Sequence, residues 1–137
     1  MRNSMILVAG TMLLAGCGDA GAGSAGEAEA ASAAEPAMEV SARDLFSAYE
    51  ANEVAAQQTY GGKPLKVTGS VQGVTLDFMD NPVIQLATSN EFLPVQATVD
   101  DADAAASISK GTTVTVLCDE LTEVIGAPQL SGCTLAE

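Results

Sequence analysis

Histidine and tryptophan are both absent from this chain of 137 residues. The lack of histidine removes the usual general base near neutral pH and the commonest metal ligand in proteins. No nucleophile can be matched with a base elsewhere in the sequence. We therefore predict no catalytic residue, no metal site and no cofactor, and we expect the protein not to be an enzyme.

Acidic residues do gather at Asp100, Asp101 and Asp103. They lack the glycine and the distal glutamate of an EF-hand calcium loop. Carboxylates are favoured at the N-terminus of a helix by the helix dipole. We interpret these three residues as the solvated start of a short helix rather than as a calcium site.

Basic residues are scarce, with 5 against 18 acidic ones and a formal net charge of −13. Such a charge repels nucleic acid and anionic membranes and favours a protein or envelope partner with a basic surface. Phe78 and Phe92 are the only aromatic residues near the expected loops. The charged residues of those loops are all acidic: Asp77, Asp80, Glu91, Asp119, Glu120 and Glu123. We predict that the protein does not bind nucleic acid.

The apolar run at residues 5–14 is too short to span a bilayer, which needs about 20 residues. It follows Arg2 and ends in LAGC at residues 14–17, which resembles the lipobox of bacterial lipoproteins. The resemblance implies that residues 1–16 are a signal peptide and that the Cys17 thiol carries a diacylglyceryl group. Its freed amine would then be acylated, with palmitate as the expected acid. The alternative is an ordinary signal peptide with an incidental cysteine.

Gly18, rather than aspartate, follows the cysteine, which resembles an outer-membrane sorting signal of the enterobacterial type. We therefore expect a lipid anchor in the outer membrane, facing the periplasm. Residues 18–39 contain no aromatic and no β-branched residue, so they cannot bury enough apolar area to offset the entropy of ordering. We predict that residues 17–39 are the lipidated cysteine with a disordered tether and that residues 40–137 form the domain.

A helical pattern covers residues 41–63, with Ser41 as N-cap, Asp44 completing a capping box and Gly61-Gly62 ending the helix. The helical period places Asn52 and Glu53 on the face expected to be buried.

Two interpretations of this polar pair are open. Asn52 and Glu53 can hydrogen-bond to strand ends of the domain, or Glu53 can pair with Lys63 or Lys66. Alternatively, Asn52, Glu53, Tyr60 and Lys63 line a small-ligand pocket under the helix.

After residue 62 the apolar period changes from 3.6 to 2, which indicates strands. We expect them at residues 63–75, 83–88, 95–99, 112–118 and 128–135, with a short helix at residues 100–109. Three strands, a helix and two strands is the order of an OB-fold. The predicted fold is mainly β, a five-stranded Greek-key barrel with an N-terminal helix and a short helix between strands three and four.

Several segments resemble one family: YEANEVAAQQTYGGK, then VTGSV, then KGTTVTVLCDEL, then a late GC. They are similar to the OB-fold bacterial lipoproteins grouped as tRNA-anticodon-binding-like. The resemblance covers nearly the whole domain and implies an OB-fold and an envelope location.

Cys118 and Cys133 lie on the last two expected strands, which are neighbours in this barrel. An exported location permits oxidation, so we predict a structural disulfide. Two buried free thiols are the alternative. Cys17, the third cysteine, is the lipidation site.

These features favour a membrane-anchored, non-catalytic binding module, with a periplasmic small-molecule binding protein as the alternative. A cavity lined by Tyr60, Asn52 and Glu53 would support a small ligand. A filled barrel with an exposed apolar patch at Phe78 or Phe92 would support a protein partner.

Overall fold

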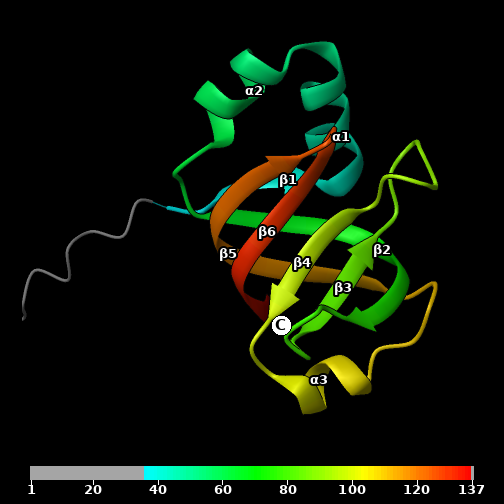
Figure 1. Ribbon diagram of the computed structural model, residues 1–137. Coiled ribbons are helices and arrows are strands. Elements are labelled where there is room, and N and C mark those ends of the chain that lie inside the picture. Colours follow the sequence, from blue (N-terminus) through cyan, green and yellow to red (C-terminus); the bar gives the residue numbers. More distant parts are fainter. Residues whose placement is uncertain (1–35, 137) are drawn as a thin grey trace, which may run out of the picture. The chain divides into compact units, whose positions relative to one another are not determined.

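Strand β2 (Leu65–Leu76) closes the sheet into a barrel, because it pairs with β3 on one side and with β5 on the other. The computed structural model describes residues 36–136 (Figure 1). Along the chain the elements are β1 (Met38–Ser41), α1 (Ala42–Ala51), α2 (Glu53–Tyr60), β2 (Leu65–Leu76), β3 (Pro82–Leu86), β4 (Val95–Val99), α3 (Ala102–Ala106), β5 (Thr113–Val124) and β6 (Ala127–Ala136).

The strand order is β1-β2-β3-β4-β6-β5, and an additional pairing of β2 with β5 closes a barrel. Strands β4 and β6 run parallel, while the other barrel pairs are antiparallel. The barrel therefore consists of β2 to β6, with α3 between its third and fourth strands. This confirms the predicted five-stranded OB-fold.

Strand β1 is an additional strand that the sequence did not predict. It pairs in parallel with the start of β2, with Met38 opposite Leu65 and Ser41 opposite Thr68. The ordered sheet thus begins at Met38, inside the segment predicted to be tether. Four residues are too few to show a strand period, and the partly buried Met38 and Val40 pack against the core only once the barrel exists.

The barrel interior is filled by side chains that alternate along the strands, as the period of two predicts. Its largest fully buried members include Leu65, Val67, Ile84, Leu86, Val95, Val116 and Leu130. Gly69 of β2 lets the Ala42 and Leu86 side chains pack directly against the strand. A Cβ at this position would lie only 3.0 Å from Ala42 Cβ and 3.1 Å from Leu86 Cβ. The pairing of β2 with β3 shifts register between Val71 and Gly73, which is typical of a β-bulge that bends the strand.

Helix α1 packs on one end of the barrel through Leu45, Phe46 and Tyr49. Its N-terminus is the predicted one, since the Ser41 hydroxyl accepts the Asp44 backbone N–H at 3.0 Å and donates to the Asp44 carboxylate at 2.7 Å. The prediction of one helix over residues 41–63 is wrong, because the chain turns at Asn52 and α2 begins there (Figure 1).

Strands β5 and β6 form a long hairpin, and Cys118 lies directly opposite Cys133 within it. A disulfide of 2.05 Å joins the two cysteines, and both are fully buried. Strand β5 extends to Val124, six residues beyond the end predicted at Cys118. Its second half is rich in acidic residues, which hid the strand period in the sequence.

Helix α3 is shorter than the predicted residues 100–109. Asp101 caps it by accepting the Ala104 N–H at 2.9 Å, in line with the interpretation of this acidic stretch as a helix start. In residues 36–136 no helix has the length and apolar character needed to cross a membrane.

Candidate functional site

Asn52 is exposed, not buried against the barrel as predicted. Its backbone is extended, with φ −166° and ψ 99°, so the helical period breaks before the side chain can turn inward. The side-chain carbonyl accepts the Ala55 N–H at 3.0 Å and caps α2. The Asn52 side chain therefore accepts a backbone N–H at the start of α2 rather than one at the strand ends of the barrel.

Glu53 is also exposed, and the predicted partners Lys63 and Lys66 are engaged elsewhere. The Lys63 ammonium donates to the Thr59 carbonyl oxygen at 2.8 Å, and the Lys66 ammonium pairs with Glu39 at 2.7 Å. The predicted pairing of Glu53 with a lysine is therefore wrong.

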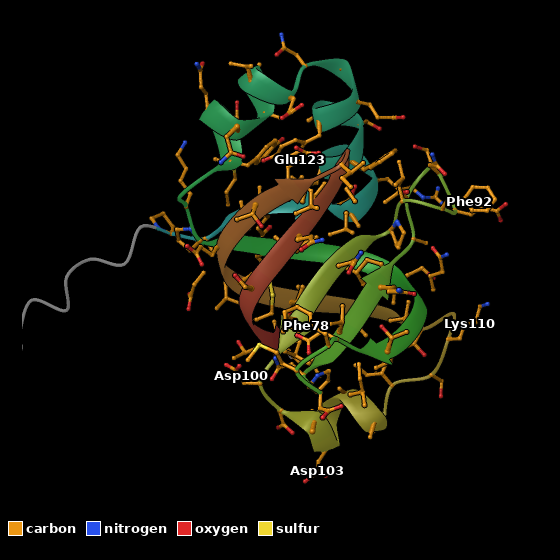
Figure 2. All side chains as sticks on the ribbon, in the orientation of Figure 1. Phe78, Phe92, Asp100, Asp103, Lys110 and Glu123 are labelled. Carbon is orange, nitrogen blue, oxygen red and sulfur yellow. A yellow bond between two sulfur atoms is a disulfide. The ribbon has the colours of Figure 1, made fainter. Side chains whose placement is uncertain are left out.

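Glu53 instead faces another carboxylate, that of Glu123 near the end of β5. The negative charge of Glu123 raises the pKa of Glu53, and a hydrogen bond between the two carboxyl groups adds to the shift. Figure 2 labels Glu123 at the end of the barrel where the helices pack.

A groove of about 490 Å³ lies between α2 and β5, lined by Glu53, Val54, Gln57, Gln58, Thr122 and Glu123. The Tyr49 hydroxyl donates to the Gln57 side-chain oxygen at 2.8 Å. Burial raises the pKa of Tyr49, and the charges of Glu123 and Glu53 raise it further. The groove is therefore an acidic environment.

The pocket predicted from Asn52, Glu53, Tyr60 and Lys63 does not assemble. Only Glu53 lines the α2–β5 groove, whereas Tyr60 packs against the core and Lys63 lies beside the start of β1. The partner across the groove, Glu123, is 70 residues away in sequence, so no local pattern could pair it with Glu53.

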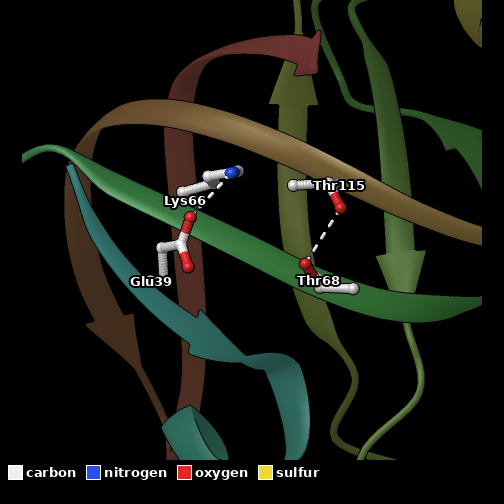
Figure 3. Close-up of polar contacts among 4 residues, drawn as sticks. All are labelled: Glu39, Lys66, Thr68 and Thr115. Carbon is white, nitrogen blue, oxygen red and sulfur yellow. Dashed lines mark hydrogen bonds and ion pairs between the residues drawn. The ribbon is translucent and has the colours of Figure 1, made fainter. Parts of the chain in front are cut away.

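A second hollow of about 370 Å³ lies over β1, β2 and β5, and its polar groups are largely bonded to each other. The Lys66–Glu39 ion pair crosses from β2 to β1, and the Thr68 and Thr115 hydroxyls lie 2.9 Å apart (Figure 3). The charge and hydrogen bond of Lys66 lower the pKa of Glu39. Sequence reasoning missed this pair because Glu39 was assigned to the tether.

The loop between β2 and β3 carries the most exposed aromatic side chain. Asp77 braces this loop by accepting the backbone N–H groups of Met79 and Asn81 at 2.7 and 2.9 Å and the Asn81 amide at 3.0 Å. The hydrogen bonds that Asp77 accepts from Asn81, together with the one from the Met79 N–H, lower the pKa of Asp77. Phe78 is 96% exposed on the braced loop, and Leu76 and Met79 beside it are exposed as well.

The loop between β3 and β4 is braced in a similar way. The Thr88 hydroxyl donates toward the carbonyls of Asn90 and Leu93, at 2.7 and 3.0 Å, and the Asn90 side chain accepts the Phe92 N–H at 3.0 Å. Gln72 of β2 donates to the Glu91 carbonyl at 2.7 Å. Phe92 is 83% exposed at the tip of this loop (Figure 2).

No group of three or more potential metal ligands occurs in the part of the chain that the structure describes. Cys17, the predicted lipidation site, lies outside residues 36–136.

Comparison with known proteins supplies a family and a fold. No curated protein matches the sequence. The crystal structure of a candidate nucleic acid-binding lipoprotein from Klebsiella pneumoniae subsp. pneumoniae MGH 78578 is similar, with a TM-score of 0.55 and 15% sequence identity. The match covers 74% of this chain and 92% of that one. At this identity the likeness shows the fold alone. The model of the tRNA_anti-like family matches residues 1–130, and the chain therefore belongs to this family.

Proposed function

We propose that the protein is a lipoprotein of the bacterial envelope, anchored through Cys17, whose OB-fold domain binds a protein partner with a basic surface. The lipobox-like LAGC at residues 14–17 supports the anchor. The likeness of the barrel to a protein named as a lipoprotein supports the same location. We propose the outer membrane as the site of the anchor, with the domain in the periplasm, because Gly18 follows the cysteine.

The observation that carries the binding proposal is the exposure of Phe78 and Phe92 on a barrel whose interior is filled. An exposed aromatic ring gains free energy when a partner covers it. Hydrogen bonds hold both loops in place, so little conformational entropy would be lost on association. A protein partner fits these features better than a ligand enclosed in the barrel.

The charge of the domain favours a basic partner over nucleic acid. Binding to phosphates requires Lys or Arg side chains along the path of the backbone. The basic residues of the described domain are Arg43, Lys63, Lys66 and Lys110. Lys66 is neutralised by Glu39, and strands β3 and β4 contain no basic and no aromatic residue. We therefore propose that this member of the family does not bind nucleic acid.

Crosslinking in cells, followed by identification of what the full-length protein captures, tests this function. We expect a captured protein with a basic surface, and we expect its recovery to fall when the salt concentration is raised before crosslinking. Recovery of nucleic acid, or recovery that is insensitive to salt, would contradict the proposal. A Cys17→Ser variant serves as the control, because it should lose the membrane location while keeping the folded domain.

A second candidate function is the binding of a small cationic ligand in the α2–β5 groove. The observation that favours it is the pair of carboxylates, Glu53 and Glu123, that face each other there. Calorimetric titration with spermidine tests it, with Glu53→Gln and Glu123→Gln as variants and Glu50→Gln on α1 as the control. Binding that survives both groove variants would contradict this candidate.

A further inference from the structure

The outer face of β3, β4 and β6 carries no charged residue, although the chain as a whole has a net charge of −13. Gln85, Gln96 and Gln129 lie opposite one another on the three strands and form a continuous row. Each of the three side chains is half-buried. We call this surface, from β3 to β6, the uncharged face.

The carboxamides of this row are free to bind. Within residues 36–136, no hydrogen bond joins the side chains of Gln85, Gln96 or Gln129 to another residue. Each carboxamide offers both a donor and an acceptor. The Gln85 side-chain oxygen lies beside Gly73 on β2, at 3.4 Å from the position a Cβ would take there.

Exposed aromatic residues stand at the two ends of this face. The loop with Phe78 precedes β3, and the loop with Phe92 follows it, so the five residues of β3 separate them. At about 3.4 Å per residue the strand spans roughly 17 Å. Acidic residues border the face: Asp77 and Asp80 lie in the loop before β3, Glu91 lies in the loop after it, and Glu120 of β5 lies opposite Ser131 of β6.

Protein interfaces share this anatomy. Their centres are depleted of charged residues and enriched in aromatic ones, while the rim is polar. A few aromatic side chains commonly supply most of the binding free energy. The acidic rim selects a partner whose own rim is basic, by charge complementarity.

We propose that the uncharged face, with Phe78 and Phe92 as its anchors, is the surface on which a protein with a basic rim docks. This inference rests on the proposed function and assigns it to one surface. A second copy of the chain would bring one acidic rim against another, and an anionic membrane or a nucleic acid would meet the same repulsion. A neutral glycan would leave the acidic rim without a counterpart.

Site-specific photo-crosslinking tests the assignment in cells that express the full-length protein. The photo-crosslinking residue p-benzoylphenylalanine replaces Gln96 at the centre of the face or, as a matched control, Ser47 on the exposed side of α1. We expect a protein adduct from position 96 and none from position 47. Mass spectrometry should place the crosslink in a segment of the partner that is flanked by Lys or Arg.

A Phe78→Ser change in the position-96 protein should reduce the adduct by at least about tenfold, as expected for an aromatic anchor. The melting temperature should stay the same, because Phe78 makes no buried contacts. An adduct that appears only at position 47 would overturn the assignment and leave the proposed function standing. No adduct at either position would contradict both. The assignment would also be overturned if the adduct at position 96 contained a second copy of the chain, a glycan or nucleic acid. It would likewise be overturned if the amount of adduct did not change with Phe78→Ser.

Discussion

Glu53, the first residue of α2, faces Glu123 near the tip of the β5–β6 hairpin, and within residues 36–136 neither carboxylate forms an ion pair. The two residues are far apart in sequence and meet because Asn52 ends α1 and turns the chain. The arrangement places like charges where the helices meet the barrel. It predicts a dependence of stability on pH.

Replacing Glu53 by Gln should raise the melting temperature at pH 7. The pKa of Glu53 is raised in the folded protein, so the folded state is stabilised by this group at pH values below its ordinary pKa of 4.5. That stabilisation is lost as the pH rises through the raised pKa. The gain from Glu53→Gln should therefore be small but measurable at pH 7 and absent well below pH 4.5. Calorimetry at both pH values checks this, with Glu50→Gln as the control, and a gain of equal size at both would argue against the repulsion.

The capping role of Asn52 predicts a loss of stability on truncation. Asn52→Ala removes the acceptor for the Ala55 N–H and should cost about 1 kcal/mol in the free energy of unfolding. Asn52→Ser retains a capping oxygen and should cost much less. Urea denaturation of both variants measures the difference. Equal losses would show that the side chain contributes something other than the cap.

The buried disulfide between Cys118 and Cys133 predicts a response to reductant. It closes a short hairpin with a sequence separation of 15 and should contribute roughly 3 kcal/mol to the free energy of unfolding. Reductant should therefore lower the melting temperature. Iodoacetamide should not label either cysteine in the unreduced native protein, and ready labelling of both would contradict the bridge.

The proposed anchor predicts the behaviour of a single variant. Cys17→Ser removes the thiol that would take the diacylglyceryl group, so the protein should move from the membrane fraction to the soluble fraction and lose incorporation of labelled palmitate. A Ser24→Ala change in the predicted tether is a matched control that keeps the thiol. Membrane retention by Cys17→Ser would mean that something other than acylation holds the protein.

Local signals predicted much of the fold. The period-two pattern of β2 and the capping box at Ser41 and Asp44 both follow from neighbouring residues, and the structure contains both. The break at Asn52 also had a local signal, because asparagine is a strong N-cap. The helical period across residues 41–63 hid that signal, since one long helix and two helices with a break at Asn52 fit the same apolar residues.

The candidate surfaces depend on contacts that the sequence does not display. The row of Gln85, Gln96 and Gln129 exists only through the registers of three strands, one pair of which is parallel. The facing carboxylates likewise need the β5–β6 hairpin to reach α2. Sequence reasoning did single out Phe78 and Phe92 as the aromatic residues near the loops, but their exposure became evident only in the folded barrel.

The most direct test of the claim that this barrel serves a basic protein rather than nucleic acid is a titration of labelled single-stranded DNA. Fluorescence anisotropy with the full-length protein at roughly 0.15 M salt measures the affinity. The acidic loops and the uncharged face predict no saturable binding. A micromolar affinity for the DNA would contradict the account.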